Sequence, residues 1–216
     1  MQHTFDFLKQ LAAHNHKEWF EQNKKLYDAS RKEHEFFVTE VLKELAERET
    51  DFAGQKAKDC MFRIFRDVRF SKDKTPYKTN FGAVFSKGGK KDAGAGYYVH
   101  LEPGKSFIGG GIWMPESVVL NKIRQEIDYN LQEFERILQE KTFKKLFGEI
   151  DGERLKKAPQ GYEETNPALP YLKLKSFTVG TALSDKDAQG KNLVKRTLEV
   201  FQTMKPFIDF LNRAIA

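Results

Sequence analysis

The sequence predicts an α+β fold in which an antiparallel sheet of about five or more strands packs with N-terminal, central and C-terminal helices. Apolar residues recur at three- and four-residue spacings in the helical regions, and they alternate with polar residues between 60 and 113. Short runs rich in Gly and Pro separate the alternating segments. With 216 residues, 39% of them apolar and nineteen Phe, the chain can bury a substantial core, so we expect a single domain over 1–216.

Residues 4–47 are predicted to form two or three helices. Trp19, Phe20 and Tyr27 belong to an apolar stripe of helical period. Thr4 is a residue type that caps helices, and Asn15 is followed three residues later by Glu18, which is the spacing of a capping box. We therefore expect Thr4 to cap the first helix and Asn15 to cap the second.

The sheet region is predicted over 60–113, where four segments alternate with period two. These segments are about 60–70, 79–86, 96–102 and 106–113. Glu102-Pro-Gly-Lys105 places Pro and Gly in the middle of a tight turn between the last two strands. Gly109–Gly111 interrupts the fourth strand, and glycines there indicate a bulge or a close approach by backbone or by a ligand.

The second half of the chain is predicted to begin with a long helix over 115–141. Pro115 suits its first turn, where the missing N–H group costs nothing. The segment 171–214 is expected to supply a fifth strand, from the alternation over 172–179, and then C-terminal helices with a bend near Pro206.

Positive charge is concentrated in one segment. Residues 56–91 carry eleven Lys or Arg against three Asp, whereas the whole chain has a net charge of only +6. Arginine side chains and turn amides suit phosphate or carboxylate groups, so the basic run predicts an anion site. The predicted anion ligands are Arg63, Arg66, Arg69, Lys72, Lys74, Lys78 and Lys175, and the predicted supporting residues are Asp67, Asp73, Tyr77, Gly110 and Trp113.

Arg66 occupies an unusual position in this run. In a strand over 60–70, it would interrupt an otherwise apolar row. A guanidinium on such a face must be paired or must line a cavity, because an unpaired buried charge is very costly. Two interpretations therefore stay open: a structural salt bridge to Glu102 or Asp73, and a ligand-binding role.

His100 and Glu102 lie on one face of the third predicted strand. A His–Glu pair performs acid–base catalysis when it meets a substrate, whereas a strand histidine is more often structural. His100 and Glu102 are therefore the catalytic candidates. The sequence does not decide whether the chain is an enzyme. The expected partner is a small phosphorylated or carboxylated metabolite.

Two alternatives belong to different functional classes. Aromatic residues lie between the cations of the basic run, which is typical of a nucleic-acid-binding module; they are Phe65, Phe70 and Tyr77. The third hypothesis is a non-catalytic interaction protein whose arginines form internal ion pairs.

The sequence lacks the motifs that mark several functional classes of protein. The chain has no complete phosphate-binding loop, no G-x-G-x-x-G and no G-x-S-x-G motif. Cys60 is its single cysteine, and no His-x-x-x-His pair is present. No stretch of about eighteen apolar residues occurs, and the N-terminus lacks a secretory pattern. We expect no cofactor, no metal, no membrane partner and a cytoplasmic location.

Five motifs together give the chain a family resemblance: they span Trp19–Tyr27, Arg63–Lys78, Gly109–Pro115, Ala158–Tyr162 and Leu174–Phe177. With them, nearly the whole chain resembles the family called domain of unknown function 2461. Gln160 departs from the pattern, because a basic residue is expected there. The resemblance implies a single intracellular α+β domain and carries over no activity, cofactor or catalytic residue.

Overall fold

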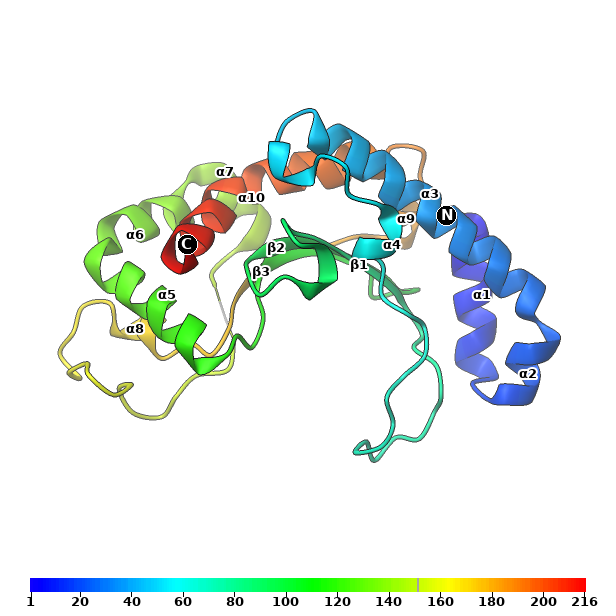
Figure 1. Cartoon of the computed structure of the whole chain (residues 1–216), viewed down its shortest axis with the longest axis horizontal. Helices are drawn as coiled ribbons and strands as arrows, with labels where there is room; N and C mark the ends of the chain where they lie inside the picture. Colours follow the sequence, from blue (N-terminus) through cyan, green and yellow to red (C-terminus); the bar gives the residue numbers. More distant parts are fainter. Residues whose placement is uncertain (151) are drawn as a thin grey trace. The chain divides into compact units, whose positions relative to one another are not determined.

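The computed structural model describes residues 1–150 and 152–216 and has an α+β fold (Figure 1). Within these residues, one antiparallel sheet has four strands in the order β1-β2-β3-β4. The strands are β1 (Phe81–Phe85), β2 (Gly96–Leu101), β3 (Phe107–Ile112) and β4 (Phe177–Ala182). The fold class is confirmed, and the prediction of five or more strands is slightly too high for the described residues.

Ten α-helices and two short 3₁₀ helices accompany the sheet in the described part of the chain. The α-helices are α1 (Gln2–Ala13), α2 (Lys17–Gln22), α3 (Lys24–Ala46), α4 (Ala57–Cys60), α5 (Ser117–Tyr129), α6 (Leu131–Gln139), α7 (Lys141–Phe147), α8 (Leu169–Leu172), α9 (Asp185–Ala188) and α10 (Leu193–Ile215). The 3₁₀ helices are η1 (Thr50–Phe52) and η2 (Gly89–Lys91).

The chain forms two compact units, each built from three segments. Unit 1 contains Met1–Lys90, Tyr98–Ile108 and Ala182–Glu199. Unit 2 contains Lys91–Tyr97, Gly109–Thr181 and Val200–Ala216. The expectation of a single domain over the whole chain stays a prediction.

The predicted strand over 60–70 is wrong. Residues 62–78, which we call the basic loop, follow α4 and contain no strand. Phe65 and Tyr77 form an isolated antiparallel bridge inside the loop, and Met61, just before the loop, forms another with Ala83 of β1. The loop closes on itself because the backbone N–H of Lys78 donates to the Ile64 carbonyl oxygen at 2.8 Å. Residue types alternate in this segment, but most of its backbone–backbone hydrogen bonds close inside the loop and do not join it to the sheet.

The first helix begins earlier than predicted. Met1 is the N-terminal cap of α1, and Thr4 is a buried residue of its first turn. The Thr4 hydroxyl donates to the Glu33 carboxylate of α3 at 2.8 Å. Thr4 therefore joins two helices and does not cap one.

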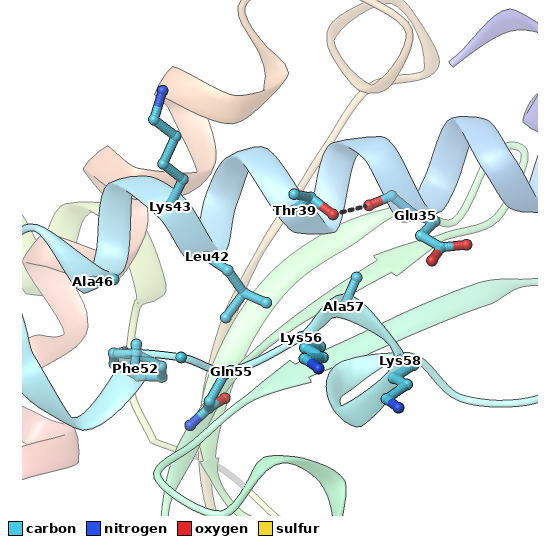
Figure 2. A pocket seen from close by; sticks show the side chains of 11 residues that line it. Glu35, Thr39, Leu42, Lys43, Ala46, Phe52, Gln55, Lys56, Ala57 and Lys58 are labelled. Atoms are coloured by element: carbon cyan, nitrogen blue, oxygen red, sulfur yellow. Dashed lines mark hydrogen bonds between the residues drawn. The ribbon is translucent and has the colours of Figure 1, made fainter.

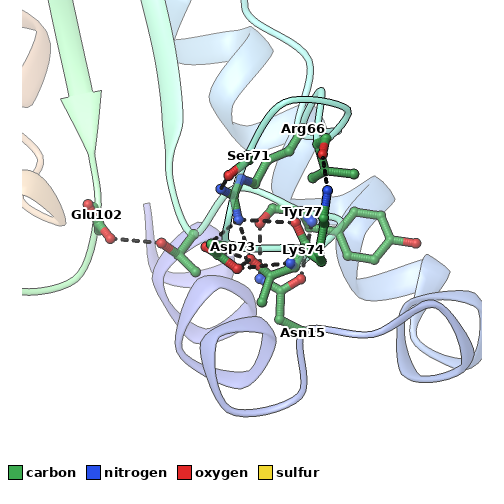
Figure 3. A network of polar contacts seen from close by, with 10 residues as sticks. Asn15, Arg66, Ser71, Asp73, Lys74, Tyr77 and Glu102 are labelled. Atoms are coloured by element: carbon green, nitrogen blue, oxygen red, sulfur yellow. Dashed lines mark hydrogen bonds and ion pairs between the residues drawn. The ribbon is translucent and has the colours of Figure 1, made fainter.

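The predicted cap of the second helix is also displaced by one residue. His16 is the N-cap of α2, and its Nδ1 accepts a hydrogen bond from the Trp19 backbone N–H at 3.4 Å. The Asn15 side chain instead binds the backbone of Tyr77, donating to its carbonyl at 3.0 Å and accepting from its N–H at 3.1 Å (Figure 3). This contact ties the helical N-terminus to the end of the basic loop.

Aromatic side chains form a large part of the core of unit 1. Phe7 of α1, Phe20 of α2 and Phe81 of β1 belong to one buried cluster. The Phe20 and Tyr77 rings stack with centroids 4.1 Å apart. His34 of α3 is fully buried, and its ring lies 5.2 Å from the Phe81 ring. The helices therefore cover one face of β1.

The other face of β1 and β2 is partly polar. Tyr98 and His100 of β2 are half-buried, whereas the alternate residues Val99 and Leu101 are fully buried. This alternation fixes which side chains face away from the helical core. We call this side the outer face.

Glycines in β3 permit close backbone packing within unit 2. Gly111 has φ +119, and a Cβ atom there would collide with the Phe177 carbonyl oxygen of β4. A Cβ atom on Gly110 would meet the Met204 sulfur and the Gly96 carbonyl oxygen. The close approach indicated by the sequence is therefore made by the protein itself.

The predicted helix over 115–141 is divided in two. Asn130 ends α5 and begins α6 with φ −122 and ψ 38, outside the helical region. Its side chain donates to the Glu126 carboxylate, and its carbonyl accepts from the Phe134 N–H group, so it serves both helices. The apolar stripe is nonetheless correct, because Ile123 and Ile127 are fully buried.

The fifth predicted strand begins five residues later than expected. Residues 169–172 form α8, with Pro170 at its start, and β4 begins at Phe177. Arg124 of α5 is buried and donates to the Leu172 and Leu174 carbonyl oxygens, so these two backbone groups pair with a side chain and not with a strand. The last predicted helical region is correct, since α10 continues through Pro206.

Candidate functional site

Arg66 is paired in the structure. Its guanidinium donates to the Asp73 carboxylate at 2.5 Å, to the Thr75 hydroxyl, and to the Thr75 carbonyl oxygen at 3.1 Å (Figure 3). Hydrogen bonds from the backbone N–H and hydroxyl of Thr75, and then from Arg66, lower the pKa of Asp73 to about 2. The salt bridge to Asp73 is one of the two interpretations that the sequence left open.

The tip of the basic loop contains two further internal pairings. Arg69 forms a two-point contact with the Asp67 carboxylate, at 3.0 and 2.7 Å. The side-chain hydrogen bond from Arg69 lowers the pKa of Asp67. Lys74 donates to the Val68 carbonyl oxygen at 3.0 Å. Lys72 has no hydrogen bond or ion pair within the part of the chain that the structure describes, and it is exposed.

Lys78 and Arg63 are the cations at the base of the loop. The Lys78 side chain is half-buried, and its ammonium lies 5.4 Å from the centre of the Phe62 ring. Burial lowers the pKa of Lys78, and the positive charge of Arg63 lowers it further. Across residues 1–150 and 152–216, neither cation forms an ion pair with a carboxylate. The charge of Arg63 thus acts on Lys78, and neither cation has a carboxylate counter-ion among the described residues.

Four side chains form a continuous hydrogen-bond network beside Lys78. We call them the polar relay: Tyr98, His100, Glu102 and Thr79. The Tyr98 hydroxyl lies 3.1 Å from His100 Nδ1, and His100 Nε2 lies 3.1 Å from the Glu102 carboxylate. The other carboxylate oxygen accepts a bond of 2.8 Å from the Thr79 hydroxyl (Figure 3). The two residues predicted as catalytic candidates are thus in direct contact.

The relay is partly shielded from water. The His100 and Glu102 side chains are 15% and 19% exposed, and the His100 ring stacks on Phe107 at 4.8 Å. Burial and the charge of Glu102 raise the pKa of Tyr98 to about 12. Burial also acts to raise the pKa of Glu102, but hydrogen bonds from His100 and Thr79 lower it overall. At neutral pH, Tyr98 therefore keeps its proton and Glu102 is ionised.

Gly82 makes room for the relay. A Cβ atom at this position of β1 would collide with the Tyr98 hydroxyl oxygen. The Gly82 carbonyl also accepts the Phe62 N–H group at 3.0 Å, which holds the Phe62 ring beside Tyr98. Sequence reasoning missed Tyr98, Thr79 and Gly82. The alternation that placed His100 and Glu102 on one face would also have placed Tyr98 there.

The remaining predicted site residues belong to unit 2. Lys175 forms an ion pair with Glu153 at 2.5 Å. Gly110 lies in the tightly packed part of β3, and the Trp113 side chain is 79% exposed. Their roles in ligand binding stay predictions, and the candidate site described here is confined to unit 1.

A separate pocket lies between α3 and the segment from η1 to α4 (Figure 2). Its volume is about 490 Å³. Leu42, Phe52 and Ala57 supply buried apolar surface, and Lys56 and Lys58 lie at its polar edge. The Gln55 amide donates to the Ser86 and Lys87 carbonyl oxygens, so this polar side chain holds the chain in place.

The described residues offer neither a metal-binding cluster nor a helix that could span a membrane. Outside the undescribed position 151, no group of three or more His, Cys, Asp or Glu side chains is placed to hold a metal ion. In the same residues, no helix combines the length and the apolar character needed to cross a membrane.

Comparisons with known proteins identify the family of the chain. No curated protein and no solved structure matches it. A family model described as conserved hypothetical protein (DUF2461) matches residues 3–210. The match includes the whole basic loop and all four residues of the relay. Because it covers nearly all of the 216 residues, the chain belongs to the DUF2461 family.

Proposed function

We propose that this protein binds a small phosphorylated or carboxylated metabolite on the outer face of β1 and β2. Lys78 and Arg63 supply the positive charge, and the polar relay lies beside them. The observation that carries the proposal is that Lys78 is half-buried over the Phe62 ring while neither it nor Arg63 has a carboxylate partner in residues 1–150 and 152–216.

The electrostatics favour an anion at this place. Like charges that lie close together, one of them half-buried, disfavour the charged state of each other. A phosphate or carboxylate between them would relieve this repulsion and accept charge-assisted hydrogen bonds, which are stronger than neutral ones. By contrast, Arg66, Arg69 and Lys175 already contact carboxylates of the protein.

A binding titration with inorganic phosphate and with citrate tests the proposal. Amide chemical shifts followed by NMR should report saturable binding that is at least about tenfold weaker in Lys78→Ala and Arg63→Ala, because each variant removes a charge-assisted contact. Lys72→Ala is the matched control, since it removes an exposed loop cation that has no partner among the described residues. Equal affinities in Lys78→Ala and Lys72→Ala, or no binding by the wild type, would contradict the proposal.

A nucleic acid is the second candidate ligand, and the tip of the loop is the observation in its favour. The Phe70 ring is 95% exposed, and the Arg69 guanidinium lies 5.9 Å from its centre. Exposed aromatic rings next to cations stack with the bases of single strands. Fluorescence anisotropy with single-stranded oligonucleotides should then show binding that weakens steeply with salt and is lost in Phe70→Ala. No binding at low salt would exclude this candidate.

A further inference from the structure

The pocket shown in Figure 2 has an apolar lining. Leu42 of α3, Phe52 of η1 and Ala57 of α4 are buried residues that line it. They come from three different elements, so the pocket exists only where these elements pack together. Its volume of about 490 Å³ lies within the range of small-molecule sites, which is roughly 300–1,000 Å³.

Gln55 holds the wall of this pocket in place. Its amide nitrogen lies 3.1, 2.8 and 2.7 Å from the carbonyl oxygens of Asp51, Ser86 and Lys87. Its amide oxygen accepts from the buried Cys60 thiol at 3.7 Å. Both ends of the amide are thus used within the protein. A wall that is fixed before a ligand arrives reduces the conformational entropy lost on binding.

Lysines without a carboxylate partner border the apolar lining. Lys56 and Lys58 are exposed, and their ammonium groups form no hydrogen bond or ion pair with any residue that the structure describes. Asp51, an acid of η1, is paired with Lys87 at 3.5 Å. Lys56 and Lys58 belong to the basic run over 56–91, but they precede the basic loop. The pocket therefore combines an apolar interior with positive charge at its edge.

The charge balance of the lining favours a ligand with a single negative charge. Among the described residues, three lysines, Lys43, Lys56 and Lys58, line the pocket with one acid, Glu35, which is a net charge of +2. The Thr39 hydroxyl donates to the Glu35 backbone carbonyl at 2.8 Å, so its proton is already used. The lysines attract a carboxylate, and Glu35 disfavours a second one on the same ligand.

We infer that this pocket binds a small monocarboxylate with an apolar body, such as an aromatic or short aliphatic acid. The apolar body packs on Leu42 and Phe52, and the carboxylate points to Lys56 and Lys58. Burial of apolar surface supplies most of the affinity, because exposed ion pairs contribute little. This site is distinct from the anion site proposed above, since it shares no residue with it and requires an apolar ligand.

Titration with 4-phenylbutyrate and with the uncharged 4-phenylbutanol tests the inference. The two probes share an apolar body and differ in the carboxylate. The methyl NMR signals of Leu42 should shift saturably with both probes, and phenylbutyrate should bind about three- to tenfold more tightly, because two exposed lysines attract it. The double variant Lys56→Ala, Lys58→Ala should lose this preference and bind phenylbutanol as the wild type does.

Two further variants serve as controls. The double variant Lys32→Ala, Lys72→Ala removes two exposed lysines that do not line the pocket, so it should keep the preference for phenylbutyrate. Ala46→Leu enlarges a side chain of the lining at the end of α3, and leucine is a good helix former. It should weaken the binding of both probes at least about tenfold, because it fills part of the pocket.

Each outcome decides for or against the pocket. Leu42 signals that move with neither probe overturn the inference. Equal affinities of the two probes, or a preference that survives in Lys56→Ala, Lys58→Ala, overturn the assignment of a carboxylate ligand. Phenylbutyrate binding that is lost in Lys78→Ala and unchanged in Ala46→Leu places the ligand on the outer face instead. A failure of phosphate to bind would contradict the proposed function and leave this inference intact.

Discussion

The tip of the basic loop, residues 66–75, contains four cations and its base contains two, Arg63 and Lys78, and the two regions differ in what those cations contact. At the tip, Arg66 and Arg69 contact carboxylates from the same loop. At the base, Lys78 and Arg63 form no ion pair within the described residues and lie beside a histidine network. Charge density along a sequence therefore does not show which charges are free to bind a ligand.

The largest expected effect is a loss of stability on acidification, which should occur at a higher pH near the base than at the tip. Burial lowers the pKa of His34, whose ring packs on Phe81 shortly after the base of the loop, to about 4, although the Gly82 backbone opposes this shift. The unfolded chain therefore binds a proton more tightly, and stability should fall by about 3 kcal/mol as pH drops from about 6.5 to 4. Urea denaturation across this range measures the loss, and His34→Phe should abolish most of it.

The tip should respond in a more acidic window. The pKa of Asp73 is lowered to about 2 in the folded protein, so its contribution to stability is lost as pH falls from 3.8 towards 2. Asp73→Asn should remove this second step and leave the His34 step unchanged. A single transition that neither variant alters would contradict the separation.

The next largest effect is on phosphate affinity, when one lysine in each region is replaced by glutamate. Lys78→Glu should weaken phosphate binding about a hundredfold or more, since it replaces an attractive contact by a repulsive one. Lys72→Glu should weaken it by less than about threefold, because an exposed charge is screened by solvent. The same NMR titration measures both variants. Comparable losses in the two would remove the distinction between tip and base.

A smaller effect concerns the packing under the relay. Gly82→Ala should lower the free energy of unfolding by about 1 to 3 kcal/mol, because the added methyl group displaces the Tyr98 ring. Urea denaturation gives the value. Gly152→Ala is the control, since its nearest neighbours lie 3.8 Å from the added carbon atom. Equal losses in both variants would show that the Tyr98 ring is not constrained.

The smallest expected effect comes from removing a carboxylate at the tip, so that one of its arginines lacks an acidic partner, as Lys78 does at the base among the described residues. Asp73→Asn removes the charge that neutralises Arg66. Its guanidinium then has no carboxylate partner, and phosphate affinity should rise about threefold. Phosphate titration of the variant measures the gain, and the double variant Arg66→Ala, Asp73→Asn should lose it. An unchanged affinity would mean that Arg66 is placed wrongly for a ligand.

Local patterns in the sequence predicted much of the fold. Helical periodicity located α1 to α3 and the apolar stripe of α5, and Glu102-Pro-Gly-Lys105 located the β2–β3 turn, where the Lys105 N–H donates to the Glu102 carbonyl at 2.9 Å. The predicted strand over 60–70 failed because alternation does not say which segment supplies the hydrogen bonds. The break at Asn130 failed because one asparagine is compatible with a helix interior.

The candidate site was predictable only in part. Alternation placed His100 and Glu102 together, and the pairing of Arg66 with Asp73 was one of two named interpretations. That Lys78 has no carboxylate partner among the described residues was not predictable, because it depends on the distance to each acid in the folded chain. Tyr98 was missed because a tyrosine in a strand is usually read as packing surface.

The amide of Asn15 has a consequence for how the base of the loop is held. An asparagine side chain presents a donor and an acceptor as a peptide group does, so Asn15 acts on Tyr77 as a neighbouring strand would. Tyr77 directly precedes Lys78. The orientation of the candidate ligand cation is thus coupled, through Tyr77, to a residue 62 positions before Tyr77 that lies between α1 and α2. Removal of the segment that contains Asn15 would therefore free the base of the loop from this backbone contact, even though neither Lys78 nor Arg63 is changed.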